Sequence, residues 1–170
     1  FRAGVGFDGM VARDARAIVR LTDGTRVAAR LVIGGDGRAS AVRQAAGIGV
    51  RTIRYGQKAL VLAVTHAAPH GNTSTEVHRS GGPFTLVPLP DIDGRPASSV
   101  VWMDDGPAIA ALSALDDAAF GAAATRRSGL VMGPLTVASP RQVWPVISQM
   151  ALALTAPRVA LMAEAAHVLH

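Results

Sequence analysis

The stretch "RLVIGGDGRASAVRQAAG", Arg30 to Gly47, passes from an apolar run through a glycine-rich turn into a helical pattern. A second stretch, "APRVALMAEAAHVLH" from Ala156 to His170, has the same order of apolar strand, carboxylate and helix start. A strand that leads directly into a helix is typical of α/β folds. The two stretches therefore predict two strand ends, each followed by a carboxylate, Asp36 in the first and Glu164 in the second.

The residues at these strand ends permit two interpretations. Glycines let a backbone approach a ligand closely, and a carboxylate beside them can accept a hydrogen bond from a ribose or ribityl hydroxyl. Strand, Gly-Asp-Gly and helix is also a common structural turn, and an acidic residue at a helix start often stabilises the helix instead. For Asp36 and Glu164 the residues alone leave both a ligand contact and a structural role open.

Length and composition indicate a globular protein of one or two domains. The chain has 170 residues, 49% of them hydrophobic, and no Cys. No apolar run reaches the ~18 residues that a membrane-spanning helix needs. A chain without Cys has no disulfide framework and suits a reducing compartment, so we expect a cytoplasmic protein.

The net charge of +5 comes almost entirely from arginine, because Lys58 is the only lysine. The arginines are scattered along the sequence and aromatic residues make up 4% of it, whereas nucleic-acid binders cluster basic residues and interleave aromatics. We therefore expect no nucleic-acid partner. Weak attraction to an anionic membrane surface is more consistent with this charge.

Hydrophobic periodicity divides the chain into three segments. The first predicts strands at 5–12, 15–21 and 26–34, an Asp-Gly turn between the last two, and a helix at 40–46. The second predicts an antiparallel meander of strands at 57–66, 74–79, 83–90 and 98–104. The third predicts helices at 106–115 and 116–129, strands at 134–139, 142–147 and 158–163, and a helix beginning near 164.

The quoted stretches also resemble a known family. "LVIGGDGRASAVR" is similar to the second fingerprint of the p-hydroxybenzoate hydroxylase-type flavin monooxygenases, and "RVALMAEAAHVLH" resembles their later fingerprint, in which Gly-Asp-Ala-Ala-His follows the strand. Between them, "YGQKALVLAVTHAAPH", "GGPFTLVPLP" and "SSVVWMDD" resemble the ubiquinone-biosynthesis FAD-dependent hydroxylases of the 2-octaprenyl-6-methoxyphenol hydroxylase kind. The order and spacing match over nearly the whole chain.

The resemblance implies an α/β to α+β fold, an internal fragment of the p-hydroxybenzoate hydroxylase-like fold with a mostly antiparallel substrate-domain sheet. Residues 1–50 would form the rear of the FAD-binding domain, 51–150 the substrate domain, and 151–170 a return to the FAD-binding domain. No G-x-G-x-x-G followed by a helix occurs in the sequence. We therefore expect a fragment without the FAD pyrophosphate loop and without activity of its own.

The resemblance also implies a set of cofactor-binding residues. They are Gly35, Asp36, Gly37 and Arg43 in the first fingerprint, and Ala163 and Glu164 in the second, where the family most often has Gly and Asp. His167 matches a family histidine to which we assign no role. No catalytic residue is assigned and no metal site is expected, because His66, His70 and His78 lack accompanying carboxylates.

The resemblance implies an FAD-dependent monooxygenase that hydroxylates a prenylated phenol in ubiquinone biosynthesis, with NAD(P)H and O2 as co-substrates. Because the flavin itself would carry out the reaction, the sequence needs no set of acid, base and nucleophile residues, and none is recognisable in it. A hydrophobic, prenylated substrate suggests peripheral association with the inner face of a membrane. Two alternative functions stay open: a related flavin reductase acting on prenyl chains, and a non-enzymatic module that binds lipid or a partner. The residues also leave the oligomeric state open.

Overall fold

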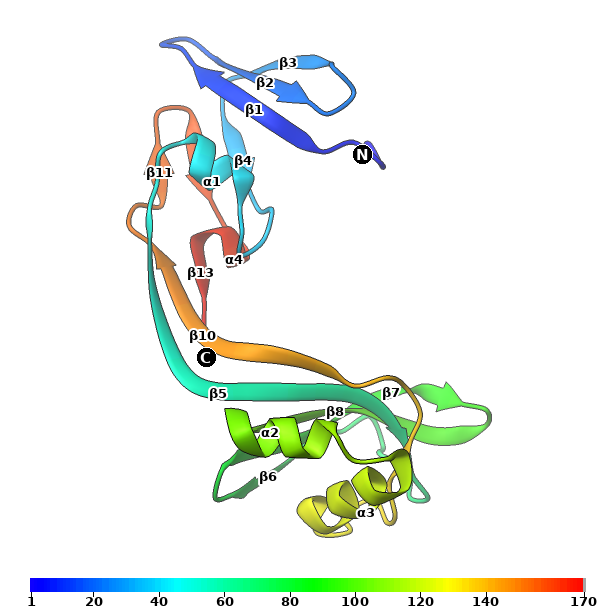
Figure 1. Ribbon diagram of the computed structural model, residues 1–170. Coiled ribbons are helices and arrows are strands. Elements are labelled where there is room, and N and C mark those ends of the chain that lie inside the picture. The colour runs from blue at the N-terminus through cyan, green and yellow to red at the C-terminus, as the bar shows by residue number, and fades with distance from the viewer. Residues whose placement is uncertain (170) are drawn as a thin grey trace. The chain divides into compact units, whose positions relative to one another are not determined.

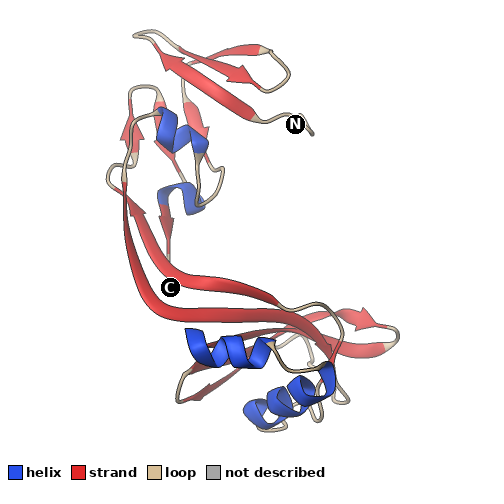
Figure 2. Ribbon diagram, in the orientation of Figure 1, coloured by secondary structure: helices blue, strands red, loops and turns tan. Residues whose placement is uncertain are grey.

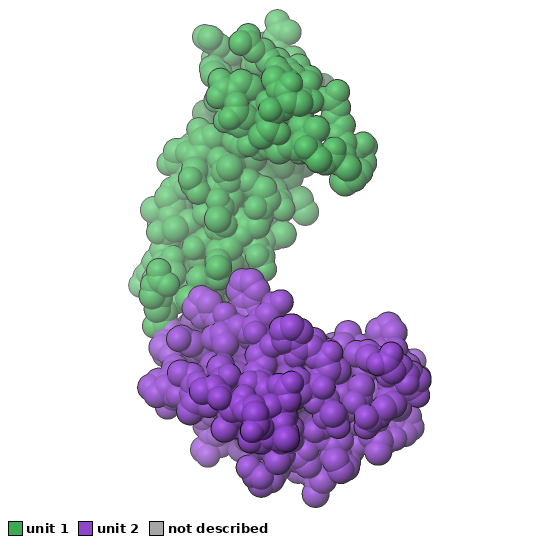
Figure 3. Space-filling model, turned by 45° about the vertical axis from the view of Figure 1, so that its right-hand side comes forward, with its two compact units in different colours: residues 1–54, 147–170 green, residues 55–146 purple. Residues whose placement is uncertain are grey.

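The computed structural model describes residues 1–169 and shows a mixed α/β architecture, mostly strands with few helices (Figures 1 and 2). The chain divides into two compact units (Figure 3). Unit 1 comprises Phe1–Arg54 and Ile147–His170, and unit 2 comprises Tyr55–Val146.

Unit 1 begins with an antiparallel sheet of three strands, β1 (Phe7–Ala12), β2 (Ala17–Leu21) and β3 (Arg26–Ala29), in the order β1-β2-β3. The predicted strands and the turn at 22–25 are confirmed, except that the predicted strand 26–34 is two strands. β3 pairs with β2, whereas β4 (Val32–Gly34) belongs to a different sheet, where the Val32 N–H donates to Arg158 O at 2.9 Å. The change of partner accounts for the break.

The second sheet of unit 1 has the order β11-β12-β4, with β11 (Thr155–Ala156) antiparallel and β4 parallel to β12 (Val159–Leu161). Helix α1 (Ala41–Ala45) follows β4, as predicted. A Cβ atom on Gly34 would lie 3.0 Å from both Val42 Cγ1 and Leu161 Cδ2. Glycine therefore suits the close packing of β4 against α1 and β12, since a Cβ would require these side chains to shift.

The helix predicted to begin near 164 is confirmed, but it is short. Helix α4 (Ala163–Ala166) ends after four residues, and the next two form β13 (His167–Val168). β13 pairs with β10 (Gln142–Ala151), where His167 lies opposite Met150. The backbone thus gains sheet hydrogen bonds at a β-branched residue, Val168, in place of a longer helix.

The largest sheet has the order β13-β10-β5-β8-β7-β6, and β9 (Thr136–Val137) also pairs with β5. Its other strands are β5 (Val50–Thr65), β6 (Thr75–Arg79), β7 (Gly82–Ile92) and β8 (Arg95–Asp105). The predicted strands are confirmed and antiparallel, but the simple meander is wrong because β5 pairs with β8 rather than with β6. This order aligns Leu60, Trp102 and Phe84 in one cross-strand apolar row.

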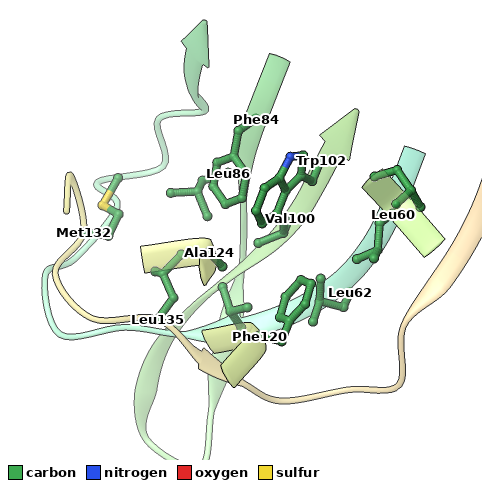
Figure 4. Close-up of a cluster of buried hydrophobic side chains, with 12 residues drawn as sticks. Leu60, Leu62, Phe84, Leu86, Val100, Trp102, Phe120, Ala124, Met132 and Leu135 are labelled. Carbon is green, nitrogen blue, oxygen red and sulfur yellow. The ribbon is translucent and has the colours of Figure 1, made fainter. Parts of the chain in front are cut away.

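Helices α2 (Gly106–Ser113) and α3 (Asp117–Ser128) pack on that apolar row and close the core of unit 2 (Figure 4). Asp105 and Asp116 accept N-cap hydrogen bonds at the two helix starts, as the sequence predicted for α3. Phe120 of α3 lies 6.1 Å from Trp102, ring centroid to ring centroid. No helix within residues 1–169 is long and apolar enough to cross a membrane.

Candidate functional site

The two predicted strand ends lie side by side in unit 1 (Figure 1). In the parallel β4–β12 ladder, Gly34 is in register with Leu161. The Met162 N–H donates to Gly34 O at 2.9 Å, so the contact continues one residue past β12. Because the carboxyl ends of parallel strands meet at one sheet edge, the loop after β4 and helix α4 begin next to each other. Loops at such an edge are the usual ligand sites of α/β sheets.

The backbone after β4 is open. Gly37 has a φ of +83°, which favours glycine, and no atom lies within 4 Å of the position that its Cβ would take. At exposed Gly35 a Cβ would meet Met162 Cγ at 3.4 Å, an ordinary contact. A ligand can therefore approach the chain closely at Gly37, beside the end of β12.

The carboxylate of Asp36 holds the first turn of α1. Its Oδ1 accepts a hydrogen bond from Ser40 Oγ, and its Oδ2 accepts one from the Val42 N–H at 3.0 Å. Ser40, fully buried, is the N-cap of α1, and its Oγ also accepts from the Arg43 N–H at 3.0 Å. Ser40 is not among the predicted site residues, although a Ser directly before a helical pattern is a recognisable N-cap signal.

These contacts set the charge of Asp36. Partial burial acts to raise the pKa of its carboxyl, but hydrogen bonds from Ser40 and from the Val42 N–H oppose this effect and outweigh it. The pKa of Asp36 therefore lies below its ordinary value. The carboxylate is charged at neutral pH and places a negative charge at the start of α1, where the helix dipole favours it.

The guanidinium of Arg43 connects the two strand ends. The side chain of Arg43 is buried, with 5% exposure, and donates to Arg38 O and to Ala165 O, both at 2.8 Å. Arg38 O also accepts from Gln149 Nε2 at 3.0 Å. Both carbonyls belong to the protein, so Arg43 fixes the loop after β4 to helix α4. Gln149 lies on β10, and no sequence signal indicated its part in the site.

The second strand end presents a strained alanine and an exposed carboxylate. Ala163 has a φ of +49°, in the left-handed region that costs a residue with a Cβ about 1 kcal/mol. Glu164 is exposed, and the N-cap position of α4 is Met162, which makes no side-chain cap bond. Among the described contacts, none assigns Glu164 to capping. His167 is exposed and forms part of β13.

These residues fit the polar half of a flavin nucleotide. A carboxylate accepts hydrogen bonds from sugar or ribityl hydroxyls, and an open glycine backbone lets a polyol or phosphate chain approach N–H groups. Glu164 supplies the exposed carboxylate and Gly37 the open backbone, at the ends of neighbouring strands. Of the six predicted residues, five lie at these two ends, and Arg43 lies beneath them.

Comparisons with known proteins agree with this geometry. The family described as FAD binding domain matches residues 9–170. Ubiquinone hydroxylase UbiL of Rhodospirillum rubrum is 41% identical over 150 residues, which cover 88% of this chain and 34% of that protein. The 3-demethoxyubiquinol 3-hydroxylase of Escherichia coli is 31% identical over 152 residues, 89% of this chain and 38% of that protein. The chain thus spans about a third of the length of these relatives.

A solved structure supports the fold. The substrate-free rebeccamycin biosynthetic enzyme REBC matches with a TM-score of 0.69 and 24% identity, over 98% of this chain and 33% of that one. The resemblance to ubiquinone-biosynthesis hydroxylases and the p-hydroxybenzoate hydroxylase-like fold are both confirmed. The chain belongs to the FAD binding domain family.

Proposed function

We propose that this chain is part of an FAD-dependent monooxygenase that hydroxylates the aromatic ring of a prenylated phenol in ubiquinone biosynthesis. The observation that carries the proposal is the pair of adjacent strand ends, with the open backbone of Gly37 on one and the exposed carboxylate of Glu164 on the other. The names of the relatives, a ubiquinone hydroxylase and a demethoxyubiquinol hydroxylase, support the substrate class.

In this proposal the predicted residues have two kinds of role. Glu164 accepts a hydrogen bond from a ribityl hydroxyl, while the backbones at Gly35, Gly37 and Ala163 allow close approach of the cofactor. Asp36 and Arg43 are positioning residues, because their hydrogen bonds go to α1, to the loop after β4 and to helix α4. FAD, reduced by NAD(P)H, supplies the activation of O2.

Unit 2 receives the substrate ring in this proposal, as the substrate domain. The boundaries of the compact units, 54/55 and 146/147, support assigning residues 51–150 to the substrate domain and the flanking segments to the FAD domain. The sheet face opposite helices α2 and α3 carries the half-buried row Val61, Val101 and Thr85. The row is mostly apolar and continues to Glu76, which lies opposite Thr85 on β6. A mostly apolar wall suits a step in which the cofactor does the chemistry.

The product of the proposed reaction differs from its substrate by one oxygen atom, and this defines the test. We expect cells lacking the gene to lose ubiquinone and to accumulate a prenylated phenol or quinol that lacks one ring oxygen, measured by mass spectrometry of lipid extracts. Normal ubiquinone without such an intermediate contradicts the proposal. An accumulated species that differs only in the saturation of its prenyl chain supports the flavin reductase instead.

A further inference from the structure

The positive charge of the protein is concentrated in one unit. Unit 1 contains eleven arginines and five carboxylates, a net charge of +6, whereas unit 2 contains six basic and seven acidic residues, a net charge of −1. The arginines look scattered in the sequence, but the fold separates them from most of the acids. An asymmetry of this kind points to an anionic partner for unit 1.

Within unit 1, three of these arginines line one groove. It has a volume of about 530 Å³ and lies along the three-stranded sheet β1–β2–β3. Arg13 follows β1, Arg20 lies on β2, and Arg26 begins β3. We call it the meander groove; its lining includes Gly9, Val11, Arg13, Ile18, Arg20 and Arg26.

The register of the sheet places like charges together in the groove. Arg20 lies directly opposite Arg26, and like charges opposite each other on neighbouring strands are destabilising. Asp8 forms an ion pair with Arg20, which offsets one charge. Arg13 and Arg26 have exposed side chains, and no carboxylate is assigned to either among the described contacts. A bound anion would relieve the remaining repulsion.

An apolar row adjoins the arginines on the same sheet face. Val11, Ile18 and Ala28 are paired across the three strands, two residues along from the row of Gly9, Arg20 and Arg26. Side chains two residues apart share a face of a sheet, so the two rows are neighbours. Val11 is 54% exposed. Basic side chains beside exposed apolar ones fit a phosphate headgroup with acyl chains beneath it.

We propose that the meander groove binds the phosphate headgroup of an anionic membrane lipid and so holds unit 1 at a membrane surface. The inference rests on the proposed function, since a prenylated substrate resides in the bilayer, and it assigns the peripheral association to named residues. A free phosphate would use the same arginines but would gain nothing from Val11 and Ile18.

Vesicle binding of double variants tests the groove. Vesicles of phosphatidylcholine with phosphatidylglycerol are compared with vesicles of phosphatidylcholine alone, in a sedimentation assay with the whole chain. The test variant is Arg13→Gln/Arg26→Gln. Two controls remove the same charge from exposed arginines elsewhere: Arg51→Gln/Arg54→Gln in unit 1, and Arg79→Gln/Arg95→Gln in unit 2. Unchanged thermal melting verifies that each variant is folded.

We expect binding to the anionic vesicles only. Arg13→Gln/Arg26→Gln should weaken it about 30-fold, since each basic residue at an anionic surface contributes about 1 kcal/mol, while the controls should weaken it less than about 3-fold. Equal losses in all three double variants overturn the groove, because they show attraction to net charge alone. Equal binding to both vesicle types overturns it as well. The lipid assignment is overturned if millimolar inorganic phosphate or a DNA duplex displaces the vesicles and Arg13→Gln/Arg26→Gln weakens the binding of that competitor as much as it weakens vesicle binding.

A failure here is distinguishable from a failure of the proposed function. The vesicle assay involves no flavin, no NAD(P)H and no substrate, and the lipid extracts of the gene deletion involve no vesicle binding. If the gene deletion removes ubiquinone as expected, but the three double variants lose vesicle binding equally, only the proposal of the groove is rejected.

Discussion

Different interactions stabilise the two units. Among the described residues, unit 2 has a core of twelve buried apolar side chains that includes Phe84, Trp102 and Phe120. The core of unit 1 has five, none of them aromatic, with the partly buried Phe7 packed against it. Unit 2 also buries Arg127, but in unit 1 the polar contacts lie at the candidate site, where Asp36 bonds to the start of α1 and Arg43 joins the loop after β4 to α4. Apolar burial stabilises unit 2, and polar contacts shape the candidate site in unit 1.

The largest expected effect is in the core of unit 2. Phe120→Ala removes a fully buried ring that packs beside Trp102, and should lower the free energy of unfolding by about 3 to 5 kcal/mol. Phe1→Ala, at a fully exposed ring, is the matched control and should change it by less than about 0.5 kcal/mol. Urea unfolding followed by tryptophan fluorescence measures both. A loss below about 1 kcal/mol for Phe120→Ala would show that this core does not hold unit 2.

The polar contacts of unit 1 are tested at Arg43. Arg43→Met keeps the length of the side chain but leaves Ala165 O without its donor, and should cost about 2 to 3 kcal/mol of unfolding free energy. Arg43→Lys should recover only part of this loss, because an ammonium lacks the fork that reaches two carbonyls.

Arg51→Met removes an exposed arginine of the same unit and serves as the control. If Arg43→Met and Arg51→Met unfold at the same denaturant concentration, the buried guanidinium contributes nothing, and the contrast between the units fails.

Asp36 makes the stability of unit 1 depend on pH. Its pKa is lowered in the folded state, so its stabilising contribution is present above the unfolded-state pKa of about 4 and is lost as the pH falls through the folded-state pKa. Asp36→Asn should lower the free energy of unfolding by about 1 kcal/mol at neutral pH, and stability should then fall less steeply as the pH is lowered. The midpoint of thermal unfolding between pH 7 and about pH 3 measures this effect. Asp91→Asn, at an exposed aspartate of unit 2, is the control, and its unfolding midpoint should depend on pH as that of the unsubstituted chain does.

The smallest expected effect is a gain at Ala163. Because its φ of +49° strains a residue with a Cβ, Ala163→Gly should raise the free energy of unfolding by about 0.5 kcal/mol. Ala165→Gly, two residues further along and fully buried in α4, should lower it by about 1 kcal/mol. Differential scanning calorimetry of the two variants should give opposite shifts. A loss at both positions would mean that the left-handed conformation of Ala163 carries no strain.

Much of the fold follows from local signals in the sequence. The Asp-Gly turn after β2, the capping aspartate before α3 and the apolar run of β12 each specify their element with residues close in sequence. The pairing of β5 with β8 and the break between β3 and β4 do not, because each depends on which distant strand supplies hydrogen bonds. Strand partners are long-range choices that periodicity does not encode.

The candidate site divides in the same way. Asp36 and Glu164 were identified from their places after apolar runs, and β4 and β12 bring the two strand ends together. The bonds of Arg43 to Ala165 O, 122 residues away, and of Gln149 to Arg38 O join positions with no common sequence signal. The concentration of positive charge in unit 1 was hidden for the same reason, since the unit is assembled from both ends of the chain.

The central claim is that the strand end at Glu164 contacts FAD, and flavin titration of Glu164 variants in the protein that contains this chain tests it most directly. Removing the acceptor in Glu164→Ala should weaken FAD binding by roughly ten- to a hundred-fold, or about 1 to 3 kcal/mol, and Glu164→Gln should lose less because it keeps one acceptor oxygen. Glu76→Ala, at an exposed carboxylate of unit 2, should bind FAD as the unsubstituted protein does. Unchanged FAD affinity in Glu164→Ala, with a lowered melting temperature, would contradict the account and leave Glu164 a structural role in α4.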